Sequence, residues 1–447
     1  MIKIYDTMTR SLRDFVPLTE NVVNMYVCGP TVYNYIHIGN ARSAVAFDTI
    51  RRYFEYCGYT VNYISNFTDV DDKIIKAANE AGISTKELSD KFIAAFMEDT
   101  AQLGIKPATQ NPRVINYMDE IIAFVSDLVD KGFAYVSEGD VYFRVAKSNN
   151  YAKLANKTLE DLEIGASGRT DAETERKENP LDFALWKAAK EGEVSWDSPW
   201  GPGRPGWHIE CSVMATEILG DTIDIHGGGA DLEFPHHTNE IAQSEAKTGK
   251  TFANYWMHNG FVNVDNEKMS KSLGNFVTVH DMLKTVDGQV LRFFLATQQY
   301  RKPINFTEKA IHDAEVNLKY LKNTHSLPLT DQVNQDELQT YLEAFQEAMD
   351  DDFNTANGVT VLFDMAKWIN SGNYDQTVKD AFEKMLQVFG IVFEEEVLDE
   401  DIEKLIEDRQ AARANKDFAT ADRIRDELAA QGIKLLDTKE GVRWTRD

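Results

Sequence analysis

The chain has 447 residues, 43% of them hydrophobic, and its 73 acidic and 47 basic residues give a net charge of −26. This length predicts about two to four domains, and no stretch approaches the roughly 18 apolar residues of a membrane span. The N-terminus has no apolar core segment, and three cysteines at long spacings make a poor disulfide framework. We therefore expect a cytoplasmic protein without a membrane anchor.

The acidic excess is concentrated in one segment. Residues 331–400 hold 17 acidic and 3 basic residues, whereas residues 401–447 hold 11 acidic and 10 basic ones. A run of this kind is typical of a solvated helical face. The negative total therefore does not exclude nucleic-acid binding by other parts of the chain.

The first half of the chain predicts an α/β domain. An apolar strand, "NVVNMYVCG", precedes a turn and a helix with apolar residues at helical spacing, Phe47, Ile50, Phe54 and Cys57. A second strand, "YTVNYISN", follows at once. This order indicates a Rossmann-like, doubly wound parallel sheet with ligands at the carboxyl ends of its strands. We expect Cys57 to be buried, whereas Cys28 lies at a strand end, where sites are usually built.

The later segments predict further units. Residues 68–200 are mainly helical with one hairpin, "FAYVSEGDVYFRV", which indicates a region inserted into the sheet domain. "DTIDIHGGGADLEF" and "YWMHNGFVNVDNEKMSKSLGN" return to strands and loops of that domain. Amphipathic helices typical of a bundle follow, and the chain finishes with a helix and a hairpin.

Four residues suggest a metal site. His236 and Glu240 are four positions apart and share one face of a helix, while Cys28 and Cys211 come from other strand ends or loops. Two thiolates, an imidazole and a carboxylate suit zinc. Taken alone, each cysteine could be an ordinary core residue, and His236 with Glu240 could be an ordinary surface pair. Spacing alone does not show that the four converge.

Two segments are candidates for phosphate binding. In "IHIGNARSA", His37 precedes a small-residue turn and a helix N-terminus, which attracts anions. "EKMSKSLGN" carries Lys268 and Lys271 on a loop closed by Gly274 and Asn275. An exposed basic turn is the alternative reading, but a leaving pyrophosphate needs a mobile lysine pair of this kind.

Together these motifs resemble the class I aminoacyl-tRNA synthetases, whose two signatures correspond here to His37–Asn40 and Lys268–Ser272. "YVCGPTVYNYIHIGNARS", "NFTDVDDKII", "RPGWHIECSVM", "DIHGGGADLEFPHHTNEIAQSE" and "LAAQGIKLLDTKEGVRW" are similar to the cysteinyl-tRNA synthetases along essentially the whole chain. The resemblance implies ATP-dependent ligation of L-cysteine to tRNA(Cys) through a cysteinyl-adenylate. It also implies Mg2+ with the ATP and a monomeric enzyme.

The resemblance assigns roles to single positions. It implies one zinc ion per subunit that receives the substrate thiol, held by Cys28, Cys211, His236 and Glu240. It implies an amino-acid pocket with Thr68, Trp207 and Asp231, and contacts to ATP and pyrophosphate from His37, Gly39, Asn40, His226, Gly227, Gly228, Gly229, Lys268, Ser270 and Lys271. Asn40 departs from the family signature, which often ends in a second histidine; an amide donates a hydrogen bond but carries no charge.

The implied domains are the two halves of the catalytic sheet domain, the connective insertion, a stem-contact region after the lysine loop, a helical bundle and an anticodon-binding α/β unit. Their expected bounds are, in that order, 1–115 with 201–275, 116–200, 276–315, 316–400 and 401–447. We expect no editing domain, because zinc binds a thiolate far better than a hydroxyl, whereas a pocket alone separates such near-isosteres by about 1 to 3 kcal/mol. Four protein ligands would close a tetrahedral zinc, so we expect five-coordination or a weakly held Glu240.

Three other functions stay open on the residues alone. A ligase that passes activated cysteine to a small amine has no use for the chain after about residue 310. A zinc hydrolase using His236 and Glu240 leaves the two thiols and the lysine loop without a role. The third is a structural zinc and RNA-binding protein. Residues available near the C-terminus for phosphates and a stacked base are Arg409, Arg413, Arg423, Arg425, Lys434, Arg443 and Trp444.

Overall fold

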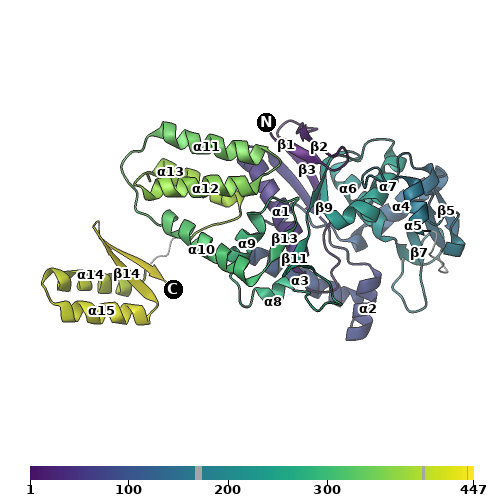
Figure 1. The fold of residues 1–447 in the computed structure, drawn as a ribbon. Helices are drawn as coiled ribbons and strands as arrows, with labels where there is room; N and C mark the ends of the chain where they lie inside the picture. Colours follow the sequence, from purple (N-terminus) through teal and green to yellow (C-terminus); the bar gives the residue numbers. More distant parts are fainter. Residues whose placement is uncertain (167–173, 395–397, 440, 447) are drawn as a thin grey trace. The chain divides into compact units, whose positions relative to one another are not determined.

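The computed structural model describes residues 1–166, 174–394, 398–439 and 441–446 (Figure 1). The chain divides into two compact units, Met1–Val392 and Phe393–Asp447.

A four-stranded parallel sheet organises the first unit. Its strand order is β10 (Ala253–Asn259), β9 (Ile223–Gly229), β3 (Val22–Val27) and β4 (Thr60–Ser65). Helix α1 (Ile38–Tyr56) follows β3 and packs on β4 and β9, and α6 (Trp207–Leu219) packs on β9. All four strands therefore end at the same edge, as the doubly wound fold class predicts.

The apolar stripe of α1 faces this sheet as expected, with Phe47, Ile50 and Phe54 buried. The prediction for Cys57 was wrong, because this residue is exposed. It is the C-cap of α1, so the helix ends before its periodicity can carry the side chain beneath the sheet.

A long insertion separates β4 from β9. Its antiparallel sheet has the order β5-β6-β7-β8, and the predicted hairpin is β5 with β6. The elements of this insertion are α2 (Asp72–Ala81), α3 (Thr85–Gln102), α4 (Met118–Asp130), β5 (Ala134–Ser137), β6 (Asp140–Phe143), α5 (Leu159–Ala166), β7 (Phe183–Ala188) and β8 (Gly203–Pro205).

Short elements complete the sheet domain. Strands β1 (Lys3–Asp6) and β2 (Ser11–Asp14) form a hairpin, and α7 (Thr238–Thr248) lies between β9 and β10 in sequence. Strand β11 (Val262–Val264) pairs with β12 (Glu267–Lys268) and with β13 (Ile304–Phe306). The lysine loop follows β12 and leads to α8 (Val279–Met282) and α9 (Gly288–Ala296).

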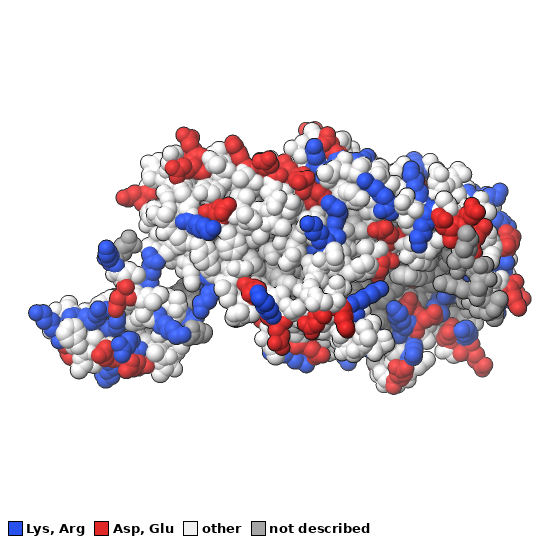
Figure 2. All heavy atoms as spheres, viewed as in Figure 1, with Lys and Arg blue, Asp and Glu red and all other residues white. Residues whose placement is uncertain are grey.

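Four helices form the predicted bundle: α10 (Glu308–His325), α11 (Gln335–Asp350), α12 (Thr355–Asn370) and α13 (Gln376–Val388). In α11 the residues Leu338, Phe345 and Met349 are buried, while Glu343 and Glu347 are exposed. Figure 2 shows acidic side chains along this helix. The acids of α11, which lie in the acidic segment, are thus on a solvated helical face, as predicted.

The second unit consists of α14 (Glu400–Ala414), α15 (Phe418–Ala430) and a hairpin of β14 (Ile433–Thr438) with β15 (Gly441–Arg446). Its core gathers Ile424, Leu428 and Ile433. Asp437 accepts a bidentate pair of hydrogen bonds from Arg409, which together with Arg413 lowers the pKa of Asp437 to about 2. Many Lys and Arg side chains cover the face of this unit drawn in Figure 2. No helix in the described ranges is long and apolar enough to cross a bilayer.

Candidate active site

The four candidate metal ligands meet at the carboxyl end of the parallel sheet. Cys28 follows β3, Cys211 lies on α6, His236 precedes α7 and Glu240 lies in the first turn of α7. One ligand atom from each lies within 4.8 Å of the other three. Cys211, His236 and Glu240 are buried and Cys28 is partly exposed. Segments far apart in the sequence therefore converge on one point.

The spacing of these atoms matches a tetrahedral zinc site. At ordinary zinc–ligand distances, tetrahedral sites place two sulfurs roughly 3.8 Å apart, sulfur and oxygen roughly 3.6 Å, and nitrogen and oxygen roughly 3.4 Å. Here Cys28 Sγ lies 3.7 Å from Cys211 Sγ and 3.6 Å from Glu240 Oε2, and His236 Nε2 lies 3.3 Å from Glu240 Oε2. The residues present fit a zinc ion.

Charge at the cluster also fits a bound cation. Burial raises the pKa of Cys28 and of Glu240, and the neighbouring Cys211 and then Glu240 raise the pKa of Cys28 further. In the described part of the chain, the ion-pair partners of Glu240 are histidines, with no lysine or arginine among them. Two thiols and a carboxylate are thus collected without a basic side chain, an arrangement that a divalent cation would compensate.

A second group, Cys28 with His226, His237 and Glu240, also lies close enough to share an ion. It fits less well, because His226 Nε2 and Glu240 Oε1 are 2.8 Å apart, which is hydrogen-bond distance. We read this contact as orienting Glu240, since it leaves Oε2 directed at the other ligands. His237 in turn contacts His258 at 2.8 Å, and His258 contacts Thr7 at 2.7 Å.

Neighbouring residues fix the approach of the two cysteines. A side chain at position 29 would collide with the backbone of Asn66, so only glycine permits this path after Cys28. Asn66 Oδ1 accepts a hydrogen bond from the Gly29 N–H at 2.9 Å and lies 3.7 Å from Cys211 Sγ. Trp207, one helical turn before Cys211, stacks on His236 with ring centroids 4.3 Å apart. Trp207 remains 41% exposed.

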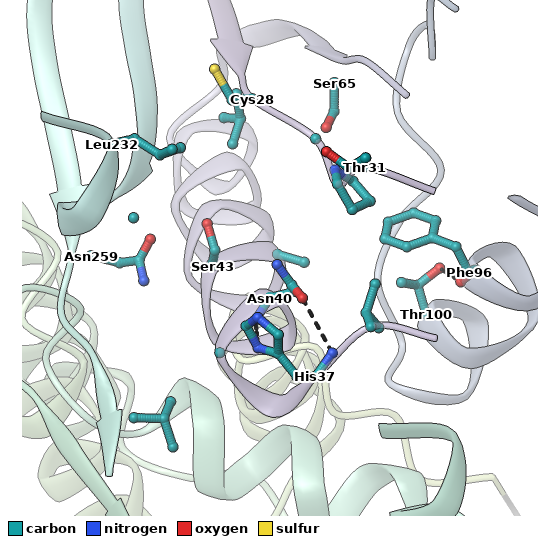
Figure 3. A pocket seen from close by; sticks show the side chains of 18 of the residues that line it. Cys28, Thr31, His37, Asn40, Ser43, Ser65, Phe96, Thr100, Leu232 and Asn259 are labelled. Carbon is teal, nitrogen blue, oxygen red and sulfur yellow. Dashed lines mark hydrogen bonds between the residues drawn. The ribbon is translucent and has the colours of Figure 1, made fainter. Parts of the chain in front are cut away.

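A cavity of about 660 Å³ joins this cluster to the phosphate-binding candidates. Cys28 belongs to both the cluster and the cavity wall, and Trp207, which stacks on His236, and Asp231 also line the cavity. Figure 3 shows Cys28 at the end of its strand, His37 and Asn40 at the start of α1, and Phe96 and Thr100 on the opposite wall. The other candidates that line the cavity are Gly39, Gly229, Lys268, Ser270 and Lys271.

His37 caps helix α1 through a reciprocal pair of hydrogen bonds. His37 Nδ1 accepts from the Asn40 backbone N–H at 3.2 Å, and Asn40 Oδ1 accepts from the His37 N–H at 3.2 Å. Gly39 is needed because a Cβ there would lie 2.9 Å from the imidazole ring. Burial, with Lys271 and then Lys73, lowers the pKa of His37 to about 4. The ring is therefore neutral, with Nδ1 accepting and the proton on Nε2.

Three family descriptions match successive parts of the chain. The family described as the "tRNA synthetases class I (C) catalytic domain" matches residues 14–316, the "DALR domain" matches residues 344–394, and the "Cysteinyl-tRNA ligase anticodon binding domain" matches residues 395–444. A cysteine--tRNA ligase of Streptococcus thermophilus (strain CNRZ 1066) is 95% identical, and one of Streptococcus agalactiae serotype III is 82% identical. Both alignments cover 100% of each chain.

The chain belongs to the cysteine--tRNA ligase family. A third cysteine--tRNA ligase, from Streptococcus pyogenes serotype M6, is 83% identical over 100% of both chains. Among solved structures, Mycobacterium tuberculosis methionyl-tRNA synthetase in complex with methionyl-adenylate has a TM-score of 0.60 at 15% identity, covering 82% of this chain and 89% of that one. That likeness supports the fold alone.

Some predicted site residues lie away from the cavity. His226 is buried against Glu240 and does not line the cavity, and of the glycine run only Gly229 is in the cavity wall. Thr68 is buried, and its hydroxyl accepts a hydrogen bond from Asn66. Sequence reasoning also missed His237, His258 and Asn66. The two histidines stand in the quoted blocks "PHHTNE" and "YWMHNG", but neither spacing nor periodicity distinguishes them from ordinary core residues.

The lysine loop is closed by one asparagine side chain. Asn275 Oδ1 accepts from the Ser270 N–H at 2.8 Å, and its Nδ2 donates to the Lys268 carbonyl at 3.3 Å. Lys271 Nζ lies 3.5 Å from the Tyr33 hydroxyl and 5.4 Å from the centre of the Phe276 ring. Both signature segments of the family therefore border the same cavity, and Tyr33 is a further wall residue that the sequence did not single out.

Proposed function

We propose that the chain joins L-cysteine to tRNA(Cys) with ATP, through a cysteinyl-adenylate formed in this cavity. The observation that carries this is the cavity itself: a thiol-rich cation site of tetrahedral spacing at one end and a neutral histidine with two lysines at the other. The matches to the DALR and anticodon binding domains favour tRNA as the acceptor over a small amine.

The residues Cys28, Cys211, His236 and Glu240 would hold one zinc ion. Bound there, zinc supplies a Lewis acid that takes the substrate thiol as thiolate and discriminates against the hydroxyl of serine. Glu240 would bind through Oε2 alone, since His226 occupies Oε1. Trp207 is exposed enough to cover the substrate side chain from the open side of the cavity.

The adenylation step uses groups at the other end. The cysteine carboxylate attacks the α-phosphorus of ATP in line, the bond to the bridging oxygen breaks, and pyrophosphate leaves with the electron pair. His37 Nε2–H, Lys268 and Lys271 stabilise the charge on the phosphates. The Ile38 and Asn40 N–H groups are already bonded within the protein. These two N–H groups are therefore occupied, and we assign the charge stabilisation to the side chains.

The transfer step follows on the same site. The 3′-terminal ribose hydroxyl of the tRNA attacks the adenylate carbonyl, and AMP leaves. Mg2+ would accompany ATP, but the described residues give no carboxylate that we assign to it. We further propose a monomer in the cytoplasm, a reducing compartment that suits the three free cysteines.

Aminoacylation tests the proposal directly. The full chain is incubated with ATP, radiolabelled cysteine and a tRNA(Cys) transcript, with a transcript carrying another anticodon and with small amines as parallel acceptors. We expect label on tRNA(Cys) alone. Transfer to a small amine with none to tRNA would support the alternative ligase, and ATP-independent hydrolysis of an amide would support the zinc hydrolase.

A further inference from the structure

Backbone hydrogen bonds join the turn that carries His37 to the residues that follow the lysine loop. The Ile38 N–H donates to the Val277 carbonyl at 3.1 Å, and the Val279 N–H donates to the Ile36 carbonyl at 2.9 Å. These bonds flank an antiparallel bridge between His37 and Thr278. The segment that carries His37 is thus joined to the segment directly after the lysine loop.

Side chains extend this junction to a third element. The Tyr35 ring stacks on the His280 ring with centroids 4.1 Å apart and planes 10° apart. His280 Nδ1 lies 3.1 Å from Asp99 Oδ1 on α3. Figure 1 draws α8, which carries His280, beside α3. Three elements distant in sequence therefore meet at His280.

Asp99 depends on this histidine. Its side chain is 2% exposed, and His280 is its ion-pair partner in the described ranges. The other carboxylate oxygen, Oδ2, is buried with no hydrogen-bond partner among the described residues. Phe96, Met97 and Thr100 on the same helix line the cavity. A movement of α3 against α8 would therefore displace these residues of the cavity wall.

We propose that Tyr35, His280 and Asp99 form a clamp that holds the His37 turn, the end of the lysine loop and the cavity wall of α3 in register. His280 is then a positioning residue for adenylate formation: it touches neither nucleotide nor cysteine and acts by fixing the groups that do. The proposal rests on the adenylation chemistry proposed above. Small displacements of such groups are costly, since about 1 Å can lower a rate by 100-fold.

The test compares four clamp variants and one control variant with the unmodified full chain in cysteine-dependent ATP–pyrophosphate exchange, with melting temperatures measured alongside. His280→Ala removes both contacts of the clamp. His280→Ala combined with Asp99→Asn also removes the buried charge. His280→Arg substitutes a planar guanidinium, which can stack on tyrosine and pair with a carboxylate. Tyr35→Leu removes the stack, and the exposed His312→Ala is the control.

We expect His280→Ala to lower kcat about tenfold with the KM for cysteine unchanged. The double variant should have the melting temperature of the unmodified chain but the lowered kcat of His280→Ala. His280→Arg should match the unmodified chain in both, and Tyr35→Leu should lower kcat. The clamp is wrong if His280→Ala leaves kcat unchanged, if the double variant regains kcat, or if only the KM for cysteine rises. An unmodified chain without any exchange would instead overturn the proposed function.

Discussion

Replacing His37 by asparagine separates its two roles. The imidazole caps α1 through Nδ1 and presents Nε2–H to the cavity. Asparagine is among the best helix N-caps, so the start of α1 should be kept, but its short side chain cannot reach a phosphate oxygen from the same backbone position. Losing one preorganised donor to transition-state charge costs about 100- to 1000-fold in kcat, or roughly 2.7 to 4 kcal/mol.

Cysteine-dependent ATP–pyrophosphate exchange measures this loss, and His37→Ala separates it from the loss of the cap. The alanine variant should lose in addition about 0.5 to 2 kcal/mol of stability. His37→Asn with kcat within threefold of the unmodified chain would refute the assigned donor role. A fall in stability equal to that of His37→Ala would refute the cap argument.

The lowered pKa of His37 also predicts how stability and the exchange rate depend on pH. Because its folded pKa of about 4 lies below the usual value near 6.5, the neutral ring stabilises the fold fully above pH 6.5. This contribution is lost as the pH falls toward 4. His37→Asn should remove that part of the decline in the free energy of unfolding. The exchange rate should show no inflection from His37 between pH 6 and 8.

Three other changes follow from the contacts described. Asn275→Ala should lower the exchange kcat about tenfold and speed trypsin cleavage at Lys268 and Lys271. Asn275→Asp keeps the acceptor for Ser270 N–H but loses the donor, so its kcat and its cleavage rate should lie between those of the unmodified chain and of Asn275→Ala. Equal cleavage rates in the three chains would contradict this. Arg292 is fully buried, with Asp48 Oδ2 at 2.6 Å and the Phe389 carbonyl at 2.9 Å. Arg292→Met should therefore lower the free energy of unfolding, measured by denaturant titration, by about 3 kcal/mol. A loss below about 1 kcal/mol would argue against a stabilising Arg292–Asp48 ion pair. A chain ending at Val392 should keep the exchange activity, but its rate of cysteine transfer to tRNA should fall roughly 100-fold. The reason is that binding energy from contacts remote from the reacting atoms is used in the transfer step. Unreduced transfer would show that the second unit is dispensable.

Sequence patterns predicted the parts of the fold that local periodicity controls. The alternation of strand and helix around α1 and the exposed acids of α11 follow from residues a few positions apart. Cys57 shows the limit of this reasoning, because periodicity indicates a face but does not say at which residue the helix ends. Burial of the last turn depends on where the C-cap falls.

The site was predictable only where a resemblance or a chemical type singled out a residue. Four zinc-type ligands could be named, but their convergence depends on strand order, which no spacing contains. His226 lies beside Glu240 although the resemblance places it near the nucleotide, since its side chain points between α7 and the sheet. The link between His37 and Thr278 joins residues about 240 positions apart. Such contacts are set by tertiary packing.

The most direct test of the central claim is cysteine-dependent ATP–pyrophosphate exchange with serine in parallel, on the unmodified chain and on Cys211→Ser, together with the zinc content of both. We predict one zinc per chain, exchange with cysteine and little with serine, and loss of both zinc and exchange in the variant. Exchange that persists in Cys211→Ser, or that accepts serine nearly as well as cysteine, would contradict selection of the substrate by a metal–thiolate bond.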